Sequence, residues 1–219
     1  MIKKDLEVYS DLTKFLLKVY GHINKELFKD ELTKNVVITV QSSVGCYGHI
    51  TIGKVWTTGQ EKSYEINLGA EGLRRGIVST VATLVHEMVH LYCLESNVKD
   101  TSRGGRYHNK TFKLLAETKL LKIDFNKSIG WSVTSSTPEL EKFILKHKYP
   151  DIKLFRGGVL TSPFVAVGGD GDGDGDGDVK IKKPSSTRKY CCPICKMTVR
   201  ATKNVNILCM DCKKQLIQE

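Results

Sequence analysis

Two histidines and a glutamate at a fixed spacing are the residues of this sequence best suited to catalysis. His86-Glu87-Met88-Val89-His90 is an H-E-x-x-H motif. Histidines four positions apart lie on one face of an α-helix, so both can reach one tetrahedral Zn²⁺ at about 2.0–2.1 Å. Zinc lowers the pKa of a bound water to about 7, and Glu87 can accept the proton as that water attacks a carbonyl. The motif therefore predicts zinc-dependent hydrolysis.

The motif lies among apolar residues that predict a buried helix, and its burial favours metal binding over a purely structural role. Burying two histidines and a glutamate is costly unless they are paired, and metal ligation pairs them. The alternative is a binding protein, such as a nucleic-acid adaptor, in which the H-E-x-x-H helix is only structural. The apolar flanking residues are Val81, Leu84, Val85, Val89 and Leu91.

A catalytic zinc usually has three protein ligands and a water, so a third ligand is needed. His108 is the strongest candidate, because it follows a polar, glycine-bearing loop at 97–107 that can return it to the motif. Glu95 and Asp100 are weaker candidates. The remaining histidines of this region are predicted to be structural or exposed: His22, His49 and His147.

The segments that must hold these residues show both helical and strand patterns. Apolar residues three and four positions apart predict helices over 6–27, 71–94, 108–121 and 137–148. In the last of these, Thr137 is placed to cap the helix, and proline occupies its first position. Short runs rich in β-branched or apolar residues predict strands at 36–40, 49–53 and 64–68. The prediction is an α+β body with helices around a small sheet.

A second group of metal-binding residues lies near the end of the chain. Cys192 and Cys195 form one C-x-x-C pair, and after thirteen intervening residues Cys209 and Cys212 form another. Four thiolates complete a tetrahedral zinc site with no open position, so this zinc is predicted to be structural. Cys191 is an alternative first ligand, but the C-x-x-C spacing favours Cys192. Disulfide pairing is the competing interpretation for these cysteines.

A low-complexity segment separates the two groups. Alternating glycine and aspartate from Gly168 to Asp178 cannot build a core, and its charges repel one another. We expect a body at 1–150, a bridge and flexible linker at 151–186, and a zinc ribbon at 187–219. A ribbon this small needs a metal to fold.

The charge of the chain indicates a polyanionic partner. There are 34 basic and 24 acidic residues, a net charge of +10. The last 41 residues hold ten basic and two acidic residues. Such a module favours nucleic acid, bound through the backbone without sequence specificity.

Composition excludes several other classes of protein. Hydrophobic residues at 40% and charged residues at 26% are ordinary for a globular protein and exclude a wholly disordered chain. No run approaches the ~20 consecutive apolar residues of a membrane span, and the first residues lack the apolar core of a secretory signal. We therefore expect a cytoplasmic protein with no membrane partner.

Four segments together match the pattern of one peptidase family. They are Asn24–Leu32, Thr83–His90, Gly105–Phe112, and the Tyr190-x-Cys-Pro-x-Cys opening of the ribbon. With these segments the chain resembles the SprT-like zinc metallopeptidases over about residues 8–145 and again from Tyr190. It is most similar to their short bacterial or phage-type members.

The resemblance implies a zincin-like fold and an endopeptidase with one catalytic and one structural zinc. It implies His86, His90 and His108 as zinc ligands and Glu87 as the catalytic acid/base. It also implies DNA binding assisted by the ribbon, single-stranded or without sequence preference. The implied substrates are DNA-bound or DNA-crosslinked proteins, which would give the protein a role in DNA repair.

Overall fold

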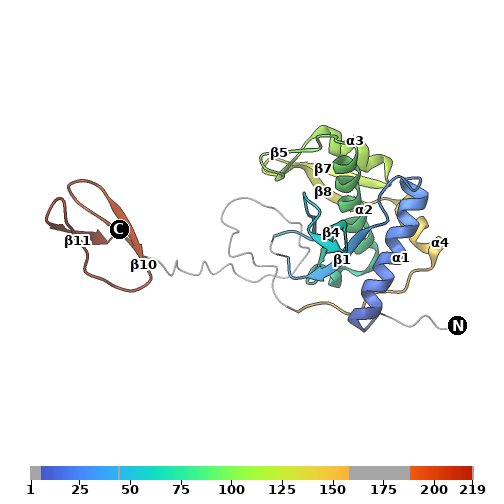
Figure 1. Cartoon of the computed structure of the whole chain (residues 1–219), viewed down its shortest axis with the longest axis horizontal. Coiled ribbons are helices and arrows are strands. Elements are labelled where there is room, and N and C mark those ends of the chain that lie inside the picture. The colour runs from blue at the N-terminus through green and yellow to red at the C-terminus, as the bar shows by residue number, and fades with distance from the viewer. Residues whose placement is uncertain (1–5, 44, 158–187, 219) are drawn as a thin grey trace. The chain divides into compact units, whose positions relative to one another are not determined.

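The computed structural model describes residues 6–43, 45–157 and 188–218. The chain divides into two compact units, Met1–Asp170 and Gly171–Glu219, here called the body and the ribbon (Figure 1). Most of the predicted linker at 151–186, with its Gly-Asp repeat, lies outside the described residues. The body is a mixed α+β structure, as predicted.

The described residues of the body form four α-helices: α1 (Tyr9–Leu27), α2 (Gly76–Glu95), α3 (Lys110–Thr118) and α4 (Pro138–His147). Each lies within or close to a predicted helix, and the differences have local causes. The segment predicted as one helix over 71–94 is divided into a 3₁₀ turn, η1 (Gly72–Arg75), and α2, because Gly76 has a φ of +79°. The third helix begins at Lys110 rather than His108, because the Asn109 side chain caps it by accepting a hydrogen bond from the Phe112 amide.

Two small sheets complete the body. In the first, β4 (Glu61–Gly69) pairs in parallel with β1 (Val36–Gln41) and antiparallel with β2 (Gly48–Ile50) and β3 (Trp56–Thr58).

The second sheet has the order β5-β6-β8-β7. It contains β5 (Thr101–Ser102), β6 (Tyr107–His108), β7 (Leu121–Asn126) and β8 (Gly130–Ser136). The β7–β8 hairpin was not predicted from the sequence. The segment predicted as a loop over 97–107 contains β5 and the first residue of β6.

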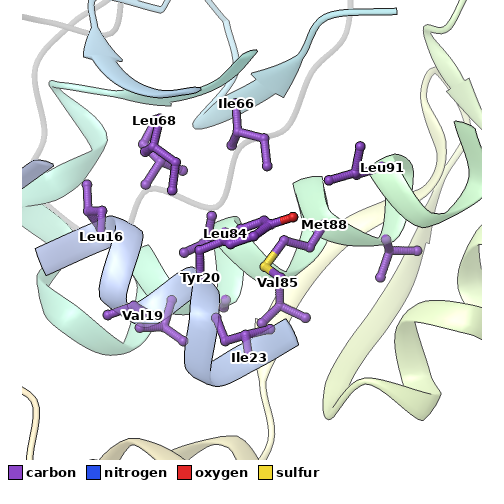
Figure 2. Packing of buried hydrophobic residues seen from close by; sticks show 14 of the residues in the cluster. Leu16, Val19, Tyr20, Ile23, Ile66, Leu68, Leu84, Val85, Met88 and Leu91 are labelled. Carbon is purple, nitrogen blue, oxygen red and sulfur yellow. The ribbon is translucent and has the colours of Figure 1, made fainter. Parts of the chain in front are cut away.

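Helix α2 is the central element of the body. It contacts both sheets and the other three helices, and Figure 2 shows its Leu84, Val85 and Met88 among side chains of α1 and β4. Ten of its residues are buried. Because α2 is closely packed on several sides, its side chains are held in fixed positions.

The same helix accounts for the one membrane-like signal among the described residues. The segment Gly72–Glu95 is long and apolar enough, by composition alone, to cross a membrane. However, 61% of its most apolar window is buried inside the body. The core helix of a soluble protein has this composition, and the burial is consistent with one.

Residues 151–157, here called the clasp, pack against the body. The Leu6 amide donates to the Asp151 carbonyl at 3.3 Å, and the Leu154 amide donates to the Leu6 carbonyl at 3.1 Å. Ile152 is buried, and the Arg156 amide donates to the Ala70 carbonyl at 3.0 Å. The clasp therefore joins residues near the start of the chain to residues just before η1.

The ribbon is a small all-β unit. Strands β9 (Arg188–Cys191), β10 (Thr198–Ala201) and β13 (Ile217–Gln218) form one sheet, and β11 (Leu208–Cys209) pairs with β12 (Lys214–Gln215). Its buried hydrophobic cluster has four members: Tyr190, Cys192, Cys209 and Leu216. Since two of these four are cysteines, little apolar packing remains to stabilise the ribbon.

Candidate metal centres

Three histidines converge in the body. Helix α2 carries His86 and His90, and β6 carries His108 to the same place. The Nε2 atoms of His86 and His90 are 3.2 Å apart, and the His108 Nε2 lies 3.3 Å from the first and 3.0 Å from the second. The structure thus brings together the two motif histidines and the preferred third candidate.

The second nitrogen of each ring has its own partner. Nδ1 of His86 lies 2.7 Å from the Thr134 Oγ1, and Nδ1 of His90 lies 2.5 Å from the Asp100 Oδ2. Nδ1 of His108 lies 3.4 Å from the Ile129 carbonyl oxygen. The Thr134 hydroxyl donates to the Ser132 carbonyl, so it accepts from His86. In each ring we assign the proton to Nδ1, which leaves the Nε2 lone pair facing the shared centre.

This arrangement fits a metal ion. Lone pairs of neutral imidazoles repel at 3.0–3.3 Å unless a cation lies between them. Ligands about 2.0–2.1 Å from a tetrahedral zinc would be roughly 3.3–3.4 Å apart. Burial, more than the neighbouring His90, lowers the pKa of His86, and it lowers that of His108 to about 4, so both rings stay neutral. The group could hold a metal ion and is compatible with zinc.

The other residues considered as third ligands have different roles. Asp100 contacts Nδ1 of His90, not the Nε2 that faces the shared centre, and it does not belong to the converging group. Glu95, the last residue of α2, accepts a hydrogen bond from the Thr33 amide at 3.1 Å.

The remaining histidines of the body lie outside this centre. His22 stacks on His147 with ring centroids 4.3 Å apart, and its Nδ1 lies 3.0 Å from the Tyr149 hydroxyl. His147 also lies 2.8 Å from Glu26, and His49 is exposed on β2. The first two pack α1 against α4, as structural residues do.

Glu87 lies on α2 between the two motif histidines and is buried, with 5% of its surface exposed. Burial raises the pKa of its carboxyl to about 7. Strand β2 passes close to it: a Cβ on Gly48 would lie 3.1 Å from Glu87 Oε1 and 2.9 Å from Thr83 Cγ2. Only glycine at position 48 lets the backbone approach the carboxylate without displacing a neighbour.

Two of the supporting groups are not visible in the sequence. Thr134 lies in the unpredicted β7–β8 hairpin, and a threonine in a strand carries no sign of a histidine partner. Asp100 was considered only as a ligand. Three other polar residues have different surroundings: the Tyr47 ring centroid lies 3.4 Å from the Arg75 guanidinium, Arg106 is exposed, and Tyr107 lines a separate cleft.

Asp100→Asn is expected to weaken zinc binding at the histidine centre. The substitution removes the negative charge that polarises the His90 ring, and such supporting groups are worth about 10–100-fold in metal affinity. The measurement is a competition between the protein and a chromophoric zinc chelator. Asp124→Asn is the matched control, since Asp124 pairs with Lys122 on the surface. An unchanged affinity in the Asp100 variant would contradict the assigned role.

The cysteine group forms a second centre. The ligand atoms of Cys192, Cys195, Cys209 and Cys212 all lie within 4.8 Å of one another. The sulfurs of Cys195 and Cys209 are 3.7 Å apart, close to the roughly 3.8 Å expected for two thiolates about 2.3 Å from one zinc. Cys191 is outside the group, and its sulfur lies 3.6 Å from the Cys192 carbonyl. These four cysteines could also hold a metal ion, and their arrangement is compatible with zinc.

The two cysteine pairs have matching turns. The Lys196 amide donates to the Cys192 carbonyl at 3.1 Å, and the Lys213 amide donates to the Cys209 carbonyl at 2.8 Å. Lys196 and Lys213 both have φ near +60° (61° and 55°). The Cys195 amide also donates to the Cys192 sulfur and lowers the pKa of that thiol. Backbone donors directed at a sulfur stabilise the thiolate that a metal needs.

Comparison with known proteins finds no counterpart: no family model, no curated protein and no solved structure matches the chain. What the chain does must therefore be inferred from its own two candidate metal centres.

Proposed function

We propose that the chain is a zinc-dependent endopeptidase of the SprT-like family, with a zincin-like body and a structural zinc in its ribbon. His86, His90 and His108 hold the catalytic zinc, and Cys192, Cys195, Cys209 and Cys212 hold the structural one. The observation that carries the proposal is the convergence of three Nε2 atoms at the helix that also carries the buried carboxylate of Glu87.

Each residue around the catalytic centre has a distinct task. The bound zinc supplies a Lewis acid that makes water acidic and polarises a carbonyl. Glu87 accepts the proton of the attacking water at its carboxylate and returns it to the leaving amine. Burial raises the pKa of this carboxyl to about 7, and the positive charge of a bound zinc would lower it again, so Glu87 is a carboxylate able to accept a proton near neutral pH. Thr134, Asp100 and the Ile129 carbonyl orient the three rings.

The substrates proposed are proteins bound or crosslinked to DNA. This part of the proposal is supported by the charge of the C-terminal segment, because residues 179–219 include ten basic and only two acidic residues. A polyanion attracted by this charge would bring its bound protein near the body. The cytoplasm, where thiols stay reduced, is the compartment that suits a cysteine-ligated ribbon.

The test is a cleavage assay on purified full-length protein with parallel metal analysis. We expect two zinc ions per chain and cleavage of an unstructured protein substrate, stopped by a chelator and restored by zinc. Adding single-stranded DNA tests whether the partner stimulates cleavage. Full zinc loading without cleavage under either condition, together with DNA binding, would instead identify a non-proteolytic DNA-binding zinc protein.

A further inference from the structure

An open cleft is lined in part by Tyr107 and Asn109, the two residues that flank His108. Tyr107, Asn109, Lys110, Phe125 and Trp131 line an open cleft of about 500 Å³. Phe125 is 50% exposed, and its ring centroid lies 5.1 Å from that of Trp131. Three aromatic rings at one open cleft make a surface on which a flat ligand can stack.

The cleft is built by the close pairing of β6 with β8. His108 pairs with Gly130, which has a φ of +75°. A Cβ on Gly130 would lie 2.1 Å from the His108 carbonyl oxygen and 2.9 Å from Tyr107 Cε1. The glycine therefore lets the Tyr107 ring lie directly against the β8 backbone, next to Trp131. The same contact that positions a metal-binding histidine also shapes the cleft.

Positive charge surrounds the rings. The Lys113 Nζ lies 4.1 Å from the centroid of the Trp131 ring, and the Arg103 guanidinium lies 4.6 Å from that of Tyr107. Lys110 lines the cleft itself. These cations are close enough to reach the phosphates of a strand whose base occupies the cleft.

The charge excess of the body is concentrated in this part of the chain. Residues 97–136 contain eight basic and three acidic residues, a net charge of +5. The rest of 1–150 contains 14 basic and 13 acidic residues, which is nearly neutral. All three acidic residues of 97–136 already have partners: Asp100 with His90, Glu117 with Lys113, and Asp124 with Lys122.

The ribbon cannot supply this kind of contact. Its only aromatic residue within 188–218 is Tyr190, which is 5% exposed and belongs to the ribbon core. Stacking on bases needs an exposed ring, so among the described residues the ribbon offers charge alone.

We infer that the cleft formed by Tyr107, Phe125 and Trp131 binds an unpaired base of a single-stranded nucleic acid. Binding sites for single strands combine a positive surface with aromatic side chains, because every base has a face that can stack. An apolar peptide side chain could enter the same cleft, but a peptide would not in general use the surrounding cations. This inference does not depend on peptidase activity.

The experiment uses the intrinsic fluorescence of the full chain. The protein has two tryptophans, Trp56 and Trp131, so in the Trp56→Phe variant only Trp131 emits. We expect single-stranded oligonucleotides of about ten nucleotides to quench this emission saturably. An abasic oligomer of equal length and charge should not quench it. Oligothymidylate and oligouridylate in separate titrations determine whether DNA or RNA binds more tightly.

Substitution then measures the contribution of each ring. Stacking is worth about 5- to 150-fold in affinity per base, so Trp131→Ala or Phe125→Ala should weaken oligonucleotide binding by that factor. The affinities of these variants are measured from the fluorescence anisotropy of a labelled oligonucleotide, because Trp131→Ala removes the emitting ring. Phe155→Ala is the matched control, because Phe155 is equally exposed but lies in the clasp. Zinc content checks that each variant is folded.

Three results would overturn the inference. The first is oligonucleotide binding without quenching of Trp131. The second is equal quenching by the abasic oligomer, which would reduce the interaction to charge. The third is quenching by an apolar peptide but not by any oligonucleotide, which would make the cleft a peptide site.

Discussion

Glu87→Gln is expected to retain the zinc of the body, while its rate of peptide-bond cleavage falls by about 10²- to 10⁴-fold. Glutamine has nearly the same size, so it fits beside Gly48 and leaves the three histidines in place. It cannot accept a proton at the position where the buried carboxylate does. Binding of metal and catalysis should therefore separate in this one variant.

The comparison requires zinc content, substrate cleavage and thermal unfolding of the variant and the wild type. Glu95→Gln is the matched control, because Glu95 ends the same helix and accepts a hydrogen bond from the Thr33 amide. It should cleave at the wild-type rate. Equal cleavage by wild type and Glu87→Gln would eliminate the proposed acid/base role.

Cys209→Ser is expected to unfold the ribbon while leaving the body folded. Cys209 is fully buried, and it belongs both to the thiol group and to the four-residue core. A structural zinc contributes about 10–16 kcal/mol to the folding of modules of this kind, far more than such a small core can replace. Loss of one ligand should therefore remove both the metal and the fold of the ribbon.

Zinc content should fall from two ions per chain to one, and the ribbon should become sensitive to limited proteolysis. Cys191→Ser is the control, since Cys191 is adjacent to a ligand but outside the group. It should keep two zinc ions and a protected ribbon. Loss of zinc in Cys191→Ser with retention in a Cys192→Ser variant would show that the first ligand had been assigned to the wrong cysteine.

The parts of the fold that the sequence predicted are those with a strong local signal. The apolar stripe of α1 and the Thr137 cap of α4 appear where they were expected, because both depend on residues close together in the chain. The Thr137 hydroxyl accepts a hydrogen bond from the Leu140 amide, as a cap should. The three histidines of the centre also have a local signal: His86 and His90 have the H-E-x-x-H spacing, and His108 follows a polar, glycine-bearing loop.

What the sequence did not predict depends on contacts between distant segments. Strand β7 alternates between apolar and polar residues over Leu121–Asn126, a signal by which it could have been predicted, but the position of the β7–β8 hairpin is fixed by distant contacts with β6 and α3. Thr134 is 48 residues from the ring that it orients. The eight basic residues of 97–136 can be counted in the sequence, but only the structure shows that residues of this segment form one cleft.

The clasp also has a mechanical consequence. A pull transmitted along the chain from beyond residue 157 would load backbone hydrogen bonds to two separate segments, one at Leu6 and one at Ala70. Ala70 lies two residues before the η1 turn that leads into α2. Tension on the C-terminal part of the chain would thus be shared between the start of the body and the approach to its central helix. Only after these bonds break would the force pass along the backbone to α4.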